Sequence, residues 1–108
     1  MPLGRILVVE DDPLVSRSVR RVLAAAGYAR LWSAASAAEG LALSAAQQPG
    51  LVLMDIGLPG ALDGIDAAQR LPQDAALVYL SGRTDPATVA RAEATAPAGF
   101  VLKPFERT

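Results

Sequence analysis

Five short apolar runs, separated by turn residues and helical patterns, are the feature that most constrains how this chain folds. The runs lie at Arg5–Val9, Ala29–Ser33, Leu51–Met54, Ala76–Leu80 and Gly99–Leu102. Short, continuous apolar runs are typical of strands that are buried on both faces of a parallel sheet, and Ala29–Ser33 is the weakest of the five. We therefore expect five strands.

The segments between these runs carry helix signals. Asp12 followed by Pro13 predicts an N-cap and a first helical residue, and apolar residues recur at helical spacing until Gly27. The other expected helices run from a Ser36/Glu39 capping box to about Gln47, from Gly64 to Leu71, and from Asp85-Pro86 to about Thr95. Five strands alternating with four helices predict a parallel α/β sheet with right-handed crossovers, and Ile56–Asp63 is an expected loop.

Length and composition exclude several classes of protein. The 108 residues suffice for one core, so we expect a single domain over residues 1–108. Ten basic and eleven acidic residues, with no basic run longer than Arg20-Arg21, argue against direct nucleic-acid binding. No run is long enough for a membrane span, and the lack of cysteine excludes disulfides and fits a cytoplasmic location. The chain has no histidine, so any phosphohistidine must belong to a partner.

Polar residues follow four of the five apolar runs: Glu10 and Asp11, Asp55, Ser81, and Lys103. Because the carboxyl ends of parallel strands meet at one edge of a sheet, we expect these side chains to share a pocket there. Clustered carboxylates repel unless a cation offsets them, and an all-oxygen site suits Mg²⁺, commonly together with phosphate. Lys103, the only lysine of the chain, can pair with Asp55 or with a phosphoryl oxygen.

Five motifs together resemble one family. ILVVEDDP, VLMDIGLPG, DGI, YLSG and GFVLKPF are similar, in order and spacing, to the receiver domains of bacterial two-component response regulators, and the resemblance covers essentially the whole chain. It implies a flavodoxin-like, doubly wound sheet with strand order 2-1-3-4-5. It also implies a phospho-acceptor rather than an enzyme. The donor would be a histidine kinase or a histidine phosphotransfer protein, and the output a homodimer or an effector domain.

The resemblance implies a role for each matching residue. Asp55 would be the phospho-acceptor, and Mg²⁺ would be held by Asp11, Asp55, the Gly57 carbonyl and, often through water, Glu10. The family's hydroxyl switch, lysine and aromatic switch positions would fall on Ser81, Lys103 and Phe100, and the Lys103-Pro104 bond is expected to be cis. Gly57 and Arg83 would tune the lifetime of the phosphoryl group.

The chain departs from the family pattern in three places. Phe100 lacks the tyrosine hydroxyl of many members, and glutamate replaces aspartate at Glu10. After Lys103-Pro104-Phe105, three residues remain, too few for a fifth helix, so one face of the sheet should be partly bare. We expect that the chain was cut before that helix, with coverage by a partner or a second copy as the alternative.

Other interpretations remain open at this point. Asp12 alone is a plain N-cap, Ser81-Gly82 can be simple turn chemistry, and Phe100 can be a core residue. A receiver that is never phosphorylated and serves only for docking keeps the same fold. An aspartate-nucleophile phosphatase would usually carry a second aspartate where Gly57 stands. In a flavin-binding protein, Glu10 and Asp11 would repel the flavin phosphate.

Overall fold

The computed structural model describes residues 4–72, 74–82 and 85–103 and has a five-stranded parallel sheet in the order β2-β1-β3-β4-β5. The strands are β1 (Arg5–Val9), β2 (Arg30–Ala34), β3 (Leu51–Asp55), β4 (Ala76–Ser81) and β5 (Gly99–Leu102). The helices are α1 (Pro13–Ala25), α2 (Ala37–Gln47), α3 (Gly64–Ala68) and α4 (Pro86–Glu93). The predicted fold class and strand order are confirmed.

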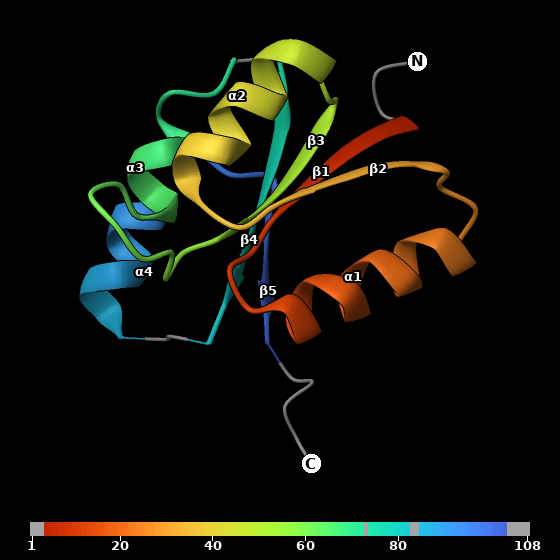
Figure 1. Cartoon of the computed structure of the whole chain (residues 1–108). Helices are drawn as coiled ribbons and strands as arrows, with labels where there is room; N and C mark the ends of the chain where they lie inside the picture. The colour runs from red at the N-terminus through yellow and green to blue at the C-terminus, as the bar shows by residue number, and fades with distance from the viewer. Residues whose placement is uncertain (1–3, 73, 83–84, 104–108) are drawn as a thin grey trace.

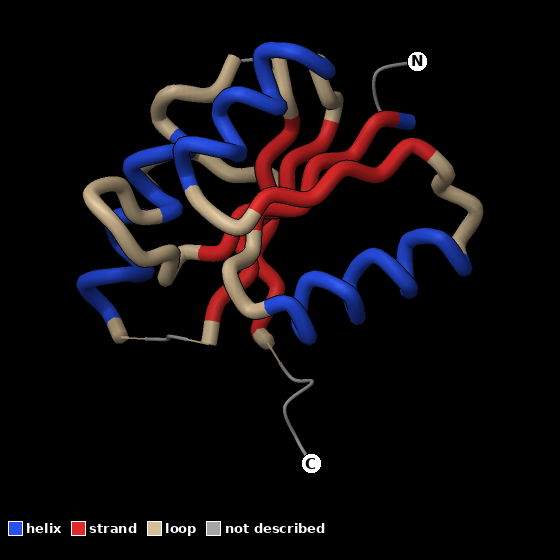
Figure 2. The backbone as a smooth tube through the Cα atoms, viewed as in Figure 1, coloured by secondary structure: helices blue, strands red, loops and turns tan. Residues whose placement is uncertain are grey.

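The sheet has an apolar core on each face, because successive side chains of a strand point to opposite sides. Ile6 and Val8 of β1 pack toward α1, whereas Leu7 and Val9 pack toward α2. Figures 1 and 2 show α1 by itself on one face and α2, α3 and α4 on the other. The last four residues of β1 are almost completely buried, which explains the continuous apolar run.

The predicted helix starts are confirmed, with one difference in detail. The Asp12 side chain accepts a hydrogen bond from the Leu14 amide (2.9 Å), and Pro13 is the first residue of α1. Ser36 accepts one from the Glu39 amide at the start of α2 (3.2 Å). A capping box would have the Glu39 carboxylate accept the amide of Ser36 itself. It accepts the amide of the preceding residue, Ala35 (2.8 Å), so this half of the expected box is wrong by one residue.

Several element boundaries differ from the prediction, and β3 and β4 each extend one residue further, to Asp55 and Ser81. β2 is shifted by one residue to Arg30–Ala34, because Ala34 pairs with Val9 and its carbonyl accepts the Glu10 amide. α3 ends at Ala68 instead of Leu71, since the following amides form short-range turns toward Pro72. α4 ends at Glu93, before Thr95.

The α1 face of the sheet is partly bare, as predicted. Val22 of α1 is 69% exposed and Val101 of β5 is 42% exposed. An apolar hollow of about 290 Å³ lies between them, lined by Ser18, Val19, Val22, Leu23, Leu53, Leu80 and Val101. The described residues contain four helices and no fifth, so this surface has no cover within them.

Candidate functional site

The parallel strands bring the predicted residues to one edge of the sheet. Asp55 is the last residue of β3 and Ser81 the last of β4, while Glu10 and Lys103 directly follow β1 and β5. The ends of β4 and β5 are joined directly, because the Ser81 carbonyl accepts a hydrogen bond from the Lys103 amide (2.9 Å). The convergence expected from the strand order is therefore present.

The Lys103 ammonium lies between two buried carboxylates. Its Nζ atom is 2.9 Å from Glu10 Oε1 and 3.0 Å from Asp55 Oδ1, and the exposed fractions of the three side chains are 17%, 0% and 4%. Burial lowers the pKa of Lys103, but the hydrogen bonds to Glu10 and Asp55 outweigh it and raise the pKa overall. Lys103 is therefore a permanent cation at the centre of the acidic cluster.

The carboxylates of Glu10, Asp11 and Asp55 carry more negative charge than one lysine can offset. Burial raises the pKa of Glu10 from its ordinary 4.5 to about 7, with the Asp55 charge as a further cause, against the hydrogen bonds from Lys103 and the Asp12 amide. Burial also raises the pKa of Asp11, and the neighbouring Asp55 carboxylate adds to the rise. Both shifts show that a second cation would be favourable here.

Glu10, Asp11 and Asp55 can together hold a metal ion. One carboxylate oxygen from each lies within 4.8 Å of the others. Asp11 and Gly57 are exposed, so an ion at this edge can keep part of its water shell, which Mg²⁺ prefers. The Gly57 amide donates to Asp55 Oδ1 (3.0 Å), which holds this loop residue beside the carboxylate. The donor set is made of oxygen only and fits a hard cation.

Of the two predicted switch positions, Ser81 ends β4 at this edge of the sheet, and Phe100 lies within β5, three residues before Lys103. Ser81 is 1% exposed and Phe100 is partly buried. Phe100 pairs with Tyr79 of β4, and their ring centroids are 5.6 Å apart in a tilted arrangement. Pro104 and Arg83 lie outside the described residues, so the cis bond and the role of Arg83 remain predictions.

Two contacts near the site were not predicted from the sequence. The buried Tyr79 hydroxyl bonds to Thr95 Oγ1 (2.8 Å), just beyond the end of α4. Arg91 of α4 contacts Asp63 and Asp66, which form a capping box at the start of α3. The Asp-x-x-Asp spacing could have revealed that box, whereas nothing in the sequence pairs it with Arg91.

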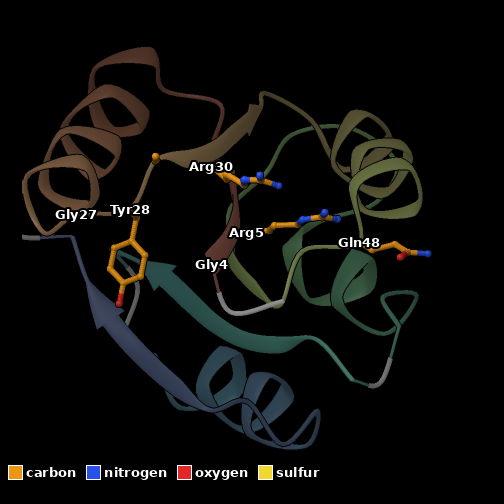
Figure 3. Close-up of a pocket in the computed structure, with 7 residues that line it drawn as sticks. Gly4, Arg5, Gly27, Tyr28, Arg30 and Gln48 are labelled. Carbon is orange, nitrogen blue, oxygen red and sulfur yellow. The ribbon is translucent and has the colours of Figure 1, made fainter. Parts of the chain in front are cut away.

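A larger hollow, of about 550 Å³, lies at the opposite end of the sheet and includes Arg5, Tyr28, Arg30 and Gln48 in its lining. Figure 3 shows that the side chains of Tyr28 and Gln48 point away from the two arginines rather than toward a common centre. Arg5 is already used locally, since its guanidinium donates to the Gln47 carbonyl (3.1 Å). A ligand site needs convergent polar groups, and those lie at the other edge.

Comparison with known proteins agrees with this geometry. The family model of the response regulator receiver domain matches residues 6–108. The chain belongs to the response regulator receiver family. Receiver domains are modules of two-component systems, and the match covers all of the sheet except Arg5, together with Glu10, Asp55 and Lys103. Within the described residues, no helix has the length and apolar character to cross a bilayer.

Individual relatives are similar over nearly the entire chain. The transcriptional regulatory protein KdpE of Mycobacterium tuberculosis is 33% identical over 102 residues, which are 93% of this chain and 44% of KdpE. The chemotaxis protein CheY of Treponema pallidum is 31% identical, with 95% of this chain and 74% of CheY covered. The chain spans less than half the length of the first curated relatives.

Solved structures show the same fold. A signal receiver domain of a modulated diguanylate cyclase from Desulfovibrio desulfuricans G20 superposes with a TM-score of 0.86 at 32% identity, over 92% of this chain and 80% of that one. A CheY-like receiver domain protein from Methanospirillum hungatei JF-1 gives 0.85 at 27% identity, over 96% and 84%.

Proposed function

We propose that residues 1–108 form one receiver domain, whose Asp55 accepts a phosphoryl group in an Mg²⁺-dependent reaction. One observation carries the proposal: a buried Asp55 carboxylate bonded to the Lys103 ammonium, with Glu10 and Asp11 close enough to share a cation. A structural ion pair needs one carboxylate for each lysine. Three clustered carboxylates with one ammonium among them, which pairs with two, favour a site that also binds a divalent cation and a phosphoryl group.

The Asp55 carboxylate is the nucleophile in this proposal. One of its oxygens forms a bond to phosphorus while the bond from phosphorus to the donor nitrogen breaks, and the electron pair leaves with the imidazole of the donor, which takes up a proton. The Gly57 amide and Lys103 hold Asp55 Oδ1, which leaves the other oxygen for attack. Lys103 then pairs with the new phosphoryl oxygens in place of the lost carboxylate charge.

Glu10, Asp11, Asp55 and the Gly57 carbonyl would hold the Mg²⁺ ion. When bound, Mg²⁺ neutralises charge on the transferring phosphoryl group. The side chains of Glu10, Asp11 and Asp55 would be its carboxylate ligands, and Glu10 must lose its proton before it contributes a negative charge. Lys103 stays charged throughout and limits the repulsion between Glu10 and Asp55.

The phosphoryl group would act as a local switch. It adds a charge of about −1.5 to −2 and oxygen acceptors, to which the Ser81 hydroxyl can donate. Phe100, in contact with Tyr79, is the aromatic partner of this rearrangement. The partners we propose are a histidine kinase or a histidine phosphotransfer protein as donor, and a homodimer or a downstream effector domain as output. Direct contact with nucleic acid or membrane is not part of the proposal, and we place the domain in the cytoplasm.

Intact mass spectrometry tests this function. The chain is incubated with Mg²⁺ and a small acyl-phosphate donor, next to an EDTA control and an Asp55→Asn variant. The expected result is a single phosphate adduct that needs both Mg²⁺ and Asp55. An adduct in the Asp55→Asn variant would refute the assignment of the acceptor.

The same experiment separates the competing functions. A folded chain that forms no adduct with small donors or with histidine kinases would be a docking module without phosphorylation. Steady release of phosphate from a phosphomonoester, without a lasting adduct, would point to a phosphatase. We propose no enzymatic turnover, since Gly57 stands where such enzymes usually have a second aspartate.

A further inference from the structure

Arg91 joins α4 to the start of α3 through two carboxylates. Its Nη1 atom is 3.1 Å from Asp63 Oδ2, and its Nη2 atom is 3.4 Å from Asp66 Oδ1. The remaining oxygens of the same carboxylates close the capping box: Asp63 Oδ1 accepts the Asp66 amide (2.8 Å) and Asp66 Oδ2 accepts the Asp63 amide (3.2 Å). Every oxygen of the pair thus has one defined partner.

The start of α3 rests directly on the backbone of the phospho-acceptor. Gly64 follows Asp63 and is buried, and a Cβ atom at Gly64 would lie 1.9 Å from the Asp55 carbonyl oxygen. The Gly64 amide donates to the Ile56 carbonyl (3.1 Å). The α3 start therefore cannot tilt or slide without disturbing the Asp55-Ile56 segment and the loop that carries Gly57.

Few close backbone contacts hold α4 in place, although its Ala92 is buried in the core on this face. Within the described residues, α1, α2 and α3 each lie close along a strand, whereas no element makes a comparably close backbone contact with α4. Figure 1 shows α4 beside α3 at the end of the helical layer. Besides the burial of Ala92 in the core, polar side chains tie this region to its surroundings: Arg91 bonds to the capping box, and Thr95, just after the helix, bonds to Tyr79.

We infer that Arg91 is a positioning residue that couples α4 to the metal-binding loop. It holds Asp63 and Asp66, these keep α3 against Asp55 and Ile56, and this contact fixes the position of the Gly57 carbonyl. When α4 moves, the loop loosens and Mg²⁺ binds more weakly; by linkage, a filled site favours the docked position of α4. The readout through Mg²⁺ rests on the proposed function.

Mg²⁺ affinity in an Arg91→Ala variant tests the coupling, because the loss of charge and the loss of positioning predict opposite changes in affinity. Removal of a positive charge near an acidic site would by itself tighten Mg²⁺ binding. Loss of positioning would weaken it, and we expect a weakening of about threefold or more, with little change in the urea midpoint since the ion pairs are exposed. Arg21→Ala, in the second half of α1, removes an equal charge from an exposed position outside the acidic cluster and should leave the affinity unchanged.

A charge-conserving variant and a metal-free measurement complete the test. The lysine ammonium is a point charge and cannot contact both carboxylates as the forked guanidinium does. Mg²⁺ binding should therefore remain weak in Arg91→Lys. Hydrogen exchange at the Gly64 amide should speed up severalfold in Arg91→Ala, while the Gly50 amide, bonded to the Arg5 carbonyl, should not change.

Three results would overturn the inference: unchanged or tighter Mg²⁺ binding in Arg91→Ala, full recovery in Arg91→Lys, or unchanged exchange at Gly64. If the unaltered chain binds no Mg²⁺, the proposed function fails. The exchange rate of the Gly64 amide then still decides whether Arg91 holds the α3 start.

Discussion

Replacement of Gly64 by alanine should disrupt the phospho-acceptor site more than any other single methyl addition in the β3–α3 loop. The added Cβ would lie 1.9 Å from the Asp55 carbonyl oxygen and 2.7 Å from its carbon, whereas real Cβ atoms essentially never come closer than 3.0 Å. The obstacle is backbone, so no side-chain rotation relieves it. Either α3 or the end of β3 must move by more than an ångström.

The expected cost follows from what that movement breaks. Overpacking a buried site costs about 1–3 kcal/mol and occasionally more. Moving α3 also stretches the hydrogen bond from the Gly64 amide to the Ile56 carbonyl. Moving Asp55 strains the hydrogen bond from the Ile56 amide to the Leu80 carbonyl (3.0 Å). Each of these hydrogen bonds is worth about 1 kcal/mol. Alanine gains about 1 kcal/mol in return at a helical position. We expect a net loss of roughly 3 kcal/mol.

Urea unfolding of Gly64→Ala beside Gly57→Ala measures this cost. A Cβ at Gly57 meets only Asp55 Oδ1, at 3.8 Å, which is ordinary contact, so this matched variant should stay within about 1 kcal/mol of the unaltered chain. Phosphate adduct formation should fall sharply in Gly64→Ala and persist in Gly57→Ala. Equal stability and equal adduct formation in the two variants would refute the reasoning.

Three further predictions concern the same region. Asp11→Asn should raise the urea midpoint of the metal-free chain, because it removes a carboxylate with a raised pKa. The same variant should bind Mg²⁺ more than about tenfold more weakly in a calorimetric titration. A lower urea midpoint would contradict this prediction. Tyr79→Phe should cost about 1 kcal/mol with an unchanged denaturant slope, since it removes only the bond to Thr95; no change in midpoint would count against it. Glu10, with a pKa raised from 4.5 to about 7, binds its proton more tightly in the folded state, so metal-free stability should fall as pH rises from about 4.5 to 7. Glu10→Gln should flatten that fall, and an unchanged slope in the variant would exclude Glu10 as its source.

The main features of the fold could be predicted because local signals agree with it. Buried strands appear as unbroken apolar runs, and the caps at Asp12, Ser36 and Asp85 all start helices. β2 was harder to place, because its residues are mostly part-exposed and its bounds depend on pairing with β1. α3 was predicted too long, since the sequence pattern does not distinguish a helical turn from the tighter turns that follow Ala68.

Site residues were predictable as a group, because parallel strands place their ends at one edge. Lys103 contacts Asp55 as expected and Glu10 as well, whereas the chemical roles of these residues remain a proposal. The links from Arg91 to Asp63 and from Tyr79 to Thr95 depend on how α4 sits on the sheet, which no local pattern specifies. A buried tyrosine does signal that its hydroxyl needs a partner, but not which one.

The position of the phosphoryl group tests the central claim most directly. After phosphorylation with Mg²⁺ and a small acyl-phosphate donor, borohydride reduction of the acyl phosphate converts an aspartyl phosphate into homoserine, which tandem mass spectrometry locates in a peptide. The account predicts homoserine at position 55 and nowhere else. Homoserine at position 11, or a phosphate adduct that resists reduction and maps to Ser81, would contradict it.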